Sequence, residues 1–188
     1  MQLLTAGLVI FLGIHLVPAL PALRASVVRG SGEARYKGVF SIVSGVGLAM
    51  IVWGYAVAPR GPQWLLPSDA ARQAAPYMVT LSFILLAAAN LRSHIRRVLV
   101  HPMLIGTGLW AATHLLANGH ARSVLLFGAF LAYAALDLGS AVGRGARKEF
   151  QPKALHDAIA VGSGIVLALL VMTFHHKLFG VPVVRWGF

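Results

Sequence analysis

Long apolar stretches, separated by short polar connections, run along the whole chain. Six of them come close to the ~20 residues that an α-helix needs to cross a bilayer, at residues 2–23, 38–58, 76–91, 102–117, 123–142 and 155–174. The bilayer interior offers no hydrogen-bond partners to the backbone groups at the edge of a strand, so such runs predict helices. The pattern therefore predicts an all-α integral membrane protein with a bundle of about six transmembrane helices. The third and fourth segments are the shortest of the six.

The connections between these segments differ in charge. Those after the first, third and fifth segments hold eleven of the sixteen basic residues: Arg24, Arg29, Arg35, Lys37, Arg92, Arg96, Arg97, Arg144, Arg147, Lys148 and Lys153. Since basic loops stay on the cytoplasmic side, both termini are expected on the outer (periplasmic) side of a bacterial inner membrane. Trp53, Tyr55, Trp64 and Trp186 fall at the outer ends, where an aromatic belt is expected.

Composition supports this interpretation. Hydrophobic residues make up 58% of the 188 and charged residues only 11%, which is typical of a membrane protein; we expect a single transmembrane domain over residues 1–188. The chain has no cysteine, which excludes disulfides, thiolate metal sites and iron–sulfur clusters. The basic residues behind the net charge of +11 lie between the apolar segments. We therefore expect them to set the membrane topology and to contact anionic lipid, and not to bind nucleic acid.

Two histidines lie deep in apolar segments. His15 in the first and His114 in the fourth are each about 18 Å from the start of their segment, near the middle of a ~30 Å core. Ionisable residues at that depth are costly and mark functional sites. Neutral imidazole is a good iron ligand, so we predict that the two side chains meet at similar depth and hold a metal cofactor, haem iron. The alternative is that each histidine is a structural residue bonded to a backbone carbonyl or a serine.

Three basic residues stand at the inner ends of the first two segments. Arg24, Arg35 and Lys37 are topology determinants, and they could also hold haem propionates, because arginine binds carboxylates bidentately. Along one continuous helix, Arg24 would lie about 13 Å from His15.

The remaining polar candidates are weaker. Asp137 is the acid inside an apolar segment, and we expect it to form an ion pair with Arg96 or Arg97, or to bind His101. The other histidines lie in loops or at segment ends, where solvation or a structural role is expected: His94, His101, His120, His156, His175 and His176.

Four stretches resemble the NnrU family: LGIHLVPALPALR (12–24), GEARYKGVFSIVSGVGLAMIVWGY (32–55), HPMLIGTGLWAATHLLANG (101–119) and LLFGAFLAYAALD (125–137). That family is associated with denitrification and nitric-oxide metabolism and is related to plant 15-cis-ζ-carotene isomerase. The resemblance covers almost the whole chain. It implies an integral membrane protein that binds haem b through two histidines, which fall on His15 and His114.

The chain departs from the family pattern at three positions. Val100 stands where the family usually has an arginine before His-Pro, and His120 stands where an acid often follows Asn-Gly. Ala111 occupies the position at which the isomerase has a cysteine, three residues before its second ligand. The resemblance therefore gives little support for a redox-driven exchange of ligands at that position.

Three functions follow from these observations. The first is a haem b protein of nitrogen-oxide metabolism that senses or handles NO or electrons. The second is a redox-dependent cis–trans isomerase of ζ-carotene or a similar polyene, in which His15 or His114 leaves reduced iron so that the metal acts as a Lewis acid. The third is a non-catalytic membrane scaffold. A fourth function, that of a membrane methyltransferase, has little support because the arginine before His-Pro is missing.

Overall fold

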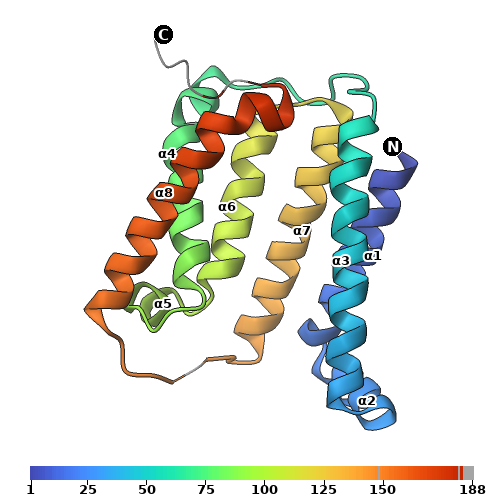
Figure 1. The fold of residues 1–188 in the computed structure, drawn as a ribbon, viewed down its shortest axis with the longest axis vertical. Helices are drawn as coiled ribbons and strands as arrows, with labels where there is room; N and C mark the ends of the chain where they lie inside the picture. The colour runs from blue at the N-terminus through green and yellow to red at the C-terminus, as the bar shows by residue number, and fades with distance from the viewer. Residues whose placement is uncertain (148, 182, 184–188) are drawn as a thin grey trace.

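A computed structural model describes residues 1–188 except 148, 182 and 184–188. Within that part the chain forms only helices and connections (Figure 1). The helices are α1 (Gln2–Ala19), α2 (Pro21–Ser31), α3 (Glu33–Val57), α4 (Asp69–Ala88), α5 (His94–Leu99), α6 (Pro102–Ala117), α7 (Ala121–Gly143) and α8 (Ala154–Phe179). The all-α prediction is confirmed. Lys148, Arg185 and Trp186 lie outside the described residues.

The first predicted segment, 2–23, is wrong as a single helix. The chain turns at Leu20, which is extended (φ −114°, ψ 90°) and separates α1 from α2. Pro21 disfavours the helical conformation for the residue before it, which explains the break. The carbonyl of Ala19 then accepts hydrogen bonds from Ser140 Oγ (2.8 Å) and from the Arg144 guanidinium, both on α7. The distance of about 13 Å from His15 to Arg24 assumed a continuous helix and does not apply.

Other boundaries follow local signals. The predicted segment 102–117 coincides with α6, which opens with a proline at its first position and ends before Asn118-Gly119. The third segment starts earlier than predicted, because Ser68 caps α4 by accepting the Ala71 N–H (3.3 Å). Helix α8 continues to Gly180, which adopts the left-handed conformation (φ 73°) that favours glycine at a helix end.

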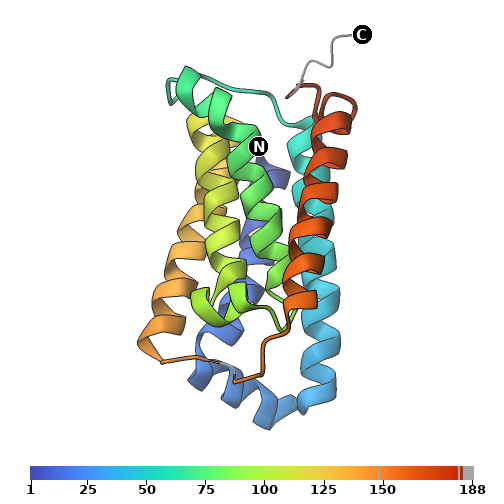
Figure 2. The ribbon, with the colours of Figure 1, turned by 90° about the vertical axis from the view of Figure 1, so that its left-hand side faces the viewer.

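Six long helices run alternately up and down, in the spatial order α3, α1, α7, α6, α4, α8 (Figures 1 and 2). Helix α7 therefore lies between α1 and α6. The short helices α2 and α5 and the connection between α7 and α8 lie at one end of the molecule, and the N-terminus and the end of α8 lie at the other (Figure 1). The three basic connections predicted to share one side thus share one end.

Four of the helices, α1, α3, α7 and α8, are long and apolar enough to cross a membrane. Helices α4 and α6 do not meet the same standard; α6 has 16 residues, about 24 Å at the helical rise. Large apolar side chains stay exposed on the outside of the bundle, such as Ile42 (68% exposed) and Val9 (67%). Apolar surface of this extent suits a lipid solvent, and the fold is that of an all-α membrane protein.

Small residues bring the helices together. A Cβ at Gly54 of α3 would come within 2.5 Å of the Leu4 nitrogen of α1, and one at Gly164 of α8 within 2.6 Å of the Ile84 Cα of α4. A Cβ at Gly106 of α6 would lie 3.0 Å from the Ser82 carbonyl oxygen of α4, and Ser82 Oγ donates to the Gly106 carbonyl (2.8 Å). Close backbone approach through glycine is the usual way that membrane helices pack.

The connection after α3 closes the end of the bundle where the N-terminus lies. The carbonyl of Gly119 accepts the N–H groups of Trp64 (2.8 Å) and Leu65 (3.2 Å), and Ser68 N–H donates to Leu116 (2.9 Å). A Cβ at Gly119 would overlap the Leu65 carbonyl. The Asn-Gly at the end of the fourth segment is therefore needed for this packing.

Candidate functional site

His15 lies near the end of α1, one turn before the break at Leu20. Its Nδ1 is 2.6 Å from the carbonyl oxygen of Phe11, one turn earlier. Three aromatic rings surround the half-buried imidazole: Phe11 on its own helix (centroids 4.2 Å apart), Phe40 of α3 (5.0 Å) and Tyr133 of α7 (6.3 Å). The side chain thus faces the junction of α1, α3 and α7.

His114 of α6 is held in the same way. Its Nδ1 is 2.8 Å from the carbonyl oxygen of Trp110, again one turn earlier. The imidazole stacks on Phe127 of α7 (centroids 4.5 Å apart, planes at 27°) and touches the Trp110 ring at 5.2 Å. Helix α7 therefore supplies an aromatic neighbour to each of the two histidines.

These two bonds define the tautomer of each ring. A carbonyl oxygen can only accept, so Nδ1 carries the proton and the lone pair stays on Nε2. Within the part of the chain that the structure describes, Nε2 of His15 and of His114 makes no hydrogen bond. A metal-binding histidine typically has one nitrogen anchored to a carbonyl and the other free for the metal. The anchoring bond would also suit a structural histidine; the free Nε2 favours ligation.

A continuous series of ring contacts joins the two histidines. The Phe11 ring meets Phe130 of α7 at 5.9 Å, and Phe130 meets Trp110 at 5.6 Å. These rings pack against a buried apolar core formed by Leu4, Leu8, Ile51, Ala111, Leu126 and Phe127. Both imidazoles therefore belong to one apolar, aromatic region centred on α7.

The prediction that the two histidines lie at similar depth needs correction. Their neighbours on α7, Tyr133 for His15 and Phe127 for His114, are six residues apart, which is about 9 Å along a helix. His15 is thus nearer the end with α2 and α5, and His114 nearer the end with the N-terminus. The sequence placed both near the midplane because it treated the two segments as straight and equally inserted.

The three basic candidates separate into two groups. Arg24 and Lys37 both bind Glu33, at 2.8 and 3.4 Å, and Arg24 also lies over the Tyr36 ring. Arg35 makes no ion pair among the described residues. It lines a groove of about 250 Å³ together with Phe40, one of the rings around His15.

Asp137 does not have the partner that the sequence suggested. It accepts a hydrogen bond from Tyr133 (3.1 Å) on the same helix, and no ion pair to a basic residue is found for it within the described chain. The predicted pairing with Arg96, Arg97 or His101 is therefore wrong. Arg96 and Arg97 lie on α5, which packs against α4, α6 and α8, and His101 caps the start of α6. Tyr133 thus connects Asp137 to the surroundings of His15.

The acid and histidine contacts between α5 and the start of α8 belong to a separate network. His94 binds Asp157 (2.6 Å), and the Nδ1 of His156 accepts the Arg92 N–H (2.9 Å). These bonds join α5 to the start of α8 and lie away from the two candidate ligands. No group of three or more His, Cys, Asp or Glu suited to a metal ion is found among the described residues. A site made of two histidines is too small to count as such a group.

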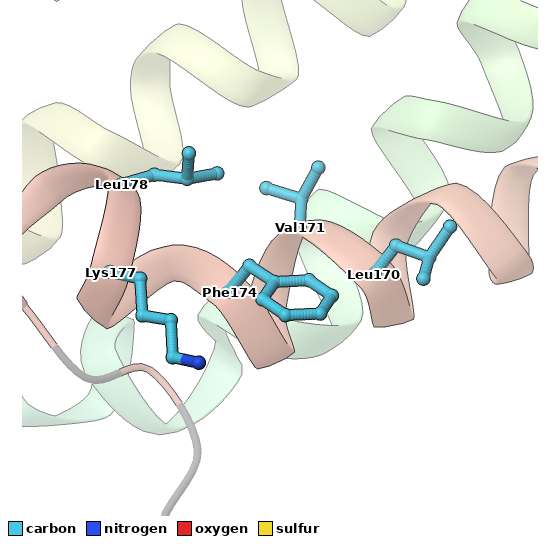
Figure 3. Close-up of a pocket in the computed structure, with 5 residues that line it drawn as sticks. All are labelled: Leu170, Val171, Phe174, Lys177 and Leu178. Atoms are coloured by element: carbon cyan, nitrogen blue, oxygen red, sulfur yellow. The ribbon is translucent and has the colours of Figure 1, made fainter.

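A shallow apolar depression of about 430 Å³ runs along α8, but neither histidine lines it. Its wall consists of Leu170, Val171, Phe174, Lys177 and Leu178, all from this one helix (Figure 3). Their spacing is that of a single helical face. We interpret it as a lipid-facing stripe of α8, separate from the candidate site.

The model of the NnrU protein family matches residues 3–183, which include both histidines. The chain belongs to the NnrU family. No match was found among curated proteins or among solved structures.

The aromatic neighbours are the residues of this NnrU chain that sequence reasoning missed. A signal for two of them was present: Phe11 and Trp110 each stand four residues before a histidine, so helical spacing alone puts ring and imidazole on one face. Phe40, Phe127 and Phe130 come from other helices. Nothing local in the sequence indicates their contact with the site.

Proposed function

We propose that this NnrU protein binds haem b, with His15 and His114 as ligands of the iron, and that it acts in nitrogen-oxide metabolism. Because the neighbours of the two rings on α7 are about 9 Å apart along the helix, binding of one iron by both histidines would require the two imidazoles to approach each other. The observation that carries the proposal is the shared state of the two rings, each with Nδ1 anchored to a carbonyl and Nε2 free. Bis-histidine ligation needs no cysteine, and the chain has none. Bound haem would supply one-electron redox chemistry and a metal at which NO can bind.

The protein's own part in this function is to position the two imidazoles and to enclose the porphyrin. The carbonyls of Phe11 and Trp110 fix the tautomer and orientation of the two imidazoles. The Phe130, Phe127 and Trp110 rings offer the apolar surroundings that a porphyrin requires and keep water away. Since a macrocycle must fit among these rings, we expect Phe130 and Trp110 to pack against it.

We assign the propionates to Arg24 and Lys37. Both already bind one carboxylate, Glu33, so their geometry suits such groups. They lie toward the end of α1 that His15 occupies. Arg35, the third basic candidate, lines the groove between α1, α2 and α3 instead.

The proposed setting is the bacterial inner membrane with six spans and both termini outside. Two features support it: α4 and α6 pack within the same bundle as the four long apolar helices, and the basic connections lie at one end (Figure 1). Basic loops remain cytoplasmic. Because α6 packs against α4 on one side and α7 on the other, it can be shorter than a helix that faces lipid along its whole length.

Redox-dependent isomerisation of a polyene is the alternative activity. Ala111 is fully buried in the apolar core, and no cysteine can replace a histidine on the iron. An isomerase would therefore have to release His15 or His114 itself. Incubation of reduced, haem-loaded protein with 15-cis-ζ-carotene tests this activity, and no conversion would reject it.

The proposed function is tested by the haem content of detergent-purified protein. We expect a b-type pyridine haemochrome with one haem per chain and low-spin absorption bands in the wild type. In both His15→Ala and His114→Ala these low-spin bands should be lost or should turn high-spin. His176→Ala is the matched control, because His176 is exposed on α8 and, among the described residues, its ring contacts neither candidate ligand. Folded wild-type protein without a Soret band would contradict the proposal.

A further inference from the structure

A narrow groove opens where α1, α2 and α3 meet, at the end of the molecule that carries the basic connections. Its volume is about 250 Å³, and its wall is almost entirely apolar. Pockets that enclose drug-sized ligands measure about 300–1,000 Å³, so this groove is too small for a macrocycle and suits a single hydrocarbon chain. It is lined by Ile14, Val17, Val27, Ser31, Arg35, Tyr36, Val39 and Phe40.

Helix α2 forms one side of the groove and has the character of a membrane-surface helix. It lies across the lower end of the bundle (Figure 2), and none of its residues is buried. Leu23 and Val27 remain 45% and 39% exposed, and Arg24 and Arg29 lie on the same short helix. Exposed apolar and basic side chains on one helix are typical of a position at the lipid interface.

The charges around the groove favour an anion. Arg24, Arg29, Arg35 and Lys37 face a single acid in this region, Glu33. Arg24 and Lys37 share that carboxylate, whereas Arg35 has no acidic partner among the described residues. A long basic side chain can line an apolar wall with its stem and keep its charge at the surface. Arg35 is therefore the free cation at this groove.

We propose that the groove binds one acyl chain of an anionic phospholipid and that Arg35 binds its phosphate. Arginine recognises phosphate bidentately, and anionic lipids of the cytoplasmic leaflet attract basic segments of this kind. The proposal rests on the membrane topology proposed above and is independent of haem.

The test is native mass spectrometry of the full-length protein titrated with phosphatidylglycerol and with phosphatidylcholine of the same acyl chains. We expect about a tenfold preference for phosphatidylglycerol, because the quaternary ammonium of phosphatidylcholine offsets the charge of the phosphate that both lipids carry. Arg35→Gln should abolish the preference, and Arg35→Lys should keep part of it. Arg29→Gln is the matched control: it removes the same charge from the same region but does not line the groove. Val39→Trp should fill the groove and weaken binding of both lipids.

Three results would overturn the proposal. Equal losses in Arg29→Gln and Arg35→Gln would mean that lipid responds only to general surface charge. Unchanged binding in Val39→Trp would place the lipid elsewhere. Loss of the haem absorbance in Arg35→Gln with lipid binding intact would assign Arg35 to a propionate. A wild-type protein that lacks haem but keeps the Arg35-dependent lipid preference would support this inference and reject the proposed function alone.

Discussion

At the scale of single residues, the protein repeats one arrangement twice. His15 and His114 each donate from Nδ1 to the carbonyl one turn earlier, and in each case that earlier residue is an aromatic whose ring touches the imidazole. The repetition on two antiparallel helices, with α7 between them, links the two histidines to one common environment. Their polar neighbours are few, and Tyr133 with its bond to Asp137 is the nearest to His15.

Tyr133→Phe should destabilise the protein, because the Asp137 carboxyl loses the hydrogen bond that it accepts on α7. Leaving a buried polar group without its partner costs about 1–3 kcal/mol, and we expect the lower part of that range since Asp137 is half-buried. Thermal unfolding in detergent measures the effect. Tyr77→Phe, at a residue 75% exposed on α4, is the control; equal effects of the two variants would contradict the argument.

At the scale of helices, close contacts at glycine hold the pairs together. The pair of α1 and α3 depends on Gly7, Gly47 and Gly54, each of which has a backbone atom of the opposite helix within 2.8 Å of where a Cβ would stand. Such contacts decide how far apart α1 and α3 lie, and therefore where Phe40 meets His15.

Gly54→Ala should push α1 away from α3 and cost about 1–3 kcal/mol, the usual range for overpacking. Gly45→Ala on the same helix is the matched control, since nothing lies within 4 Å of its Cβ position. It should be neutral or stabilising by up to about 1 kcal/mol. Chemical unfolding monitored by helical circular dichroism compares the two. A stable Gly54→Ala variant with unchanged haem affinity would contradict the proposed packing.

How much of the fold could be predicted from the sequence is clearest from individual elements. Helix α6 was predicted with its observed bounds, because Pro102 and Asn118-Gly119 mark both ends locally. The bounds of the first segment were not predicted correctly, because the apolar stretch continues across Leu20 although Pro21 ends the helix there. The candidate ligands came from depth in apolar segments. Tyr133 as the partner of Asp137 and Phe40 beside His15 depend on side-chain packing, which hydropathy does not encode.

At the scale of the whole molecule, the distribution of basic residues follows the two ends of the helical bundle. The three basic connections and the short helices α2 and α5 share one end, and the closed connection over Gly119 forms the other (Figure 1). The candidate site lies between these ends, and the proposed lipid groove at the basic one. A membrane protein with this layout would expose its basic end to the cytoplasm.

The absence of cysteine permits a direct test of this orientation. We expect Leu66→Cys, at a position 91% exposed in the connection over Gly119, to react with a membrane-impermeant maleimide in spheroplasts. Arg29→Cys on α2 should react only after the membrane is opened. The reverse pattern, or equal labelling of both, would contradict the topology.

The central claim, that His15 and His114 bind the same iron, is tested most directly by low-temperature electron paramagnetic resonance of the oxidised protein. We predict a low-spin signal in the wild type that turns high-spin in His15→Gly and in His114→Gly, and that returns to low-spin when imidazole is added to either variant. A low-spin signal that survives in one variant without imidazole would contradict the claim, because that histidine would then not be a ligand.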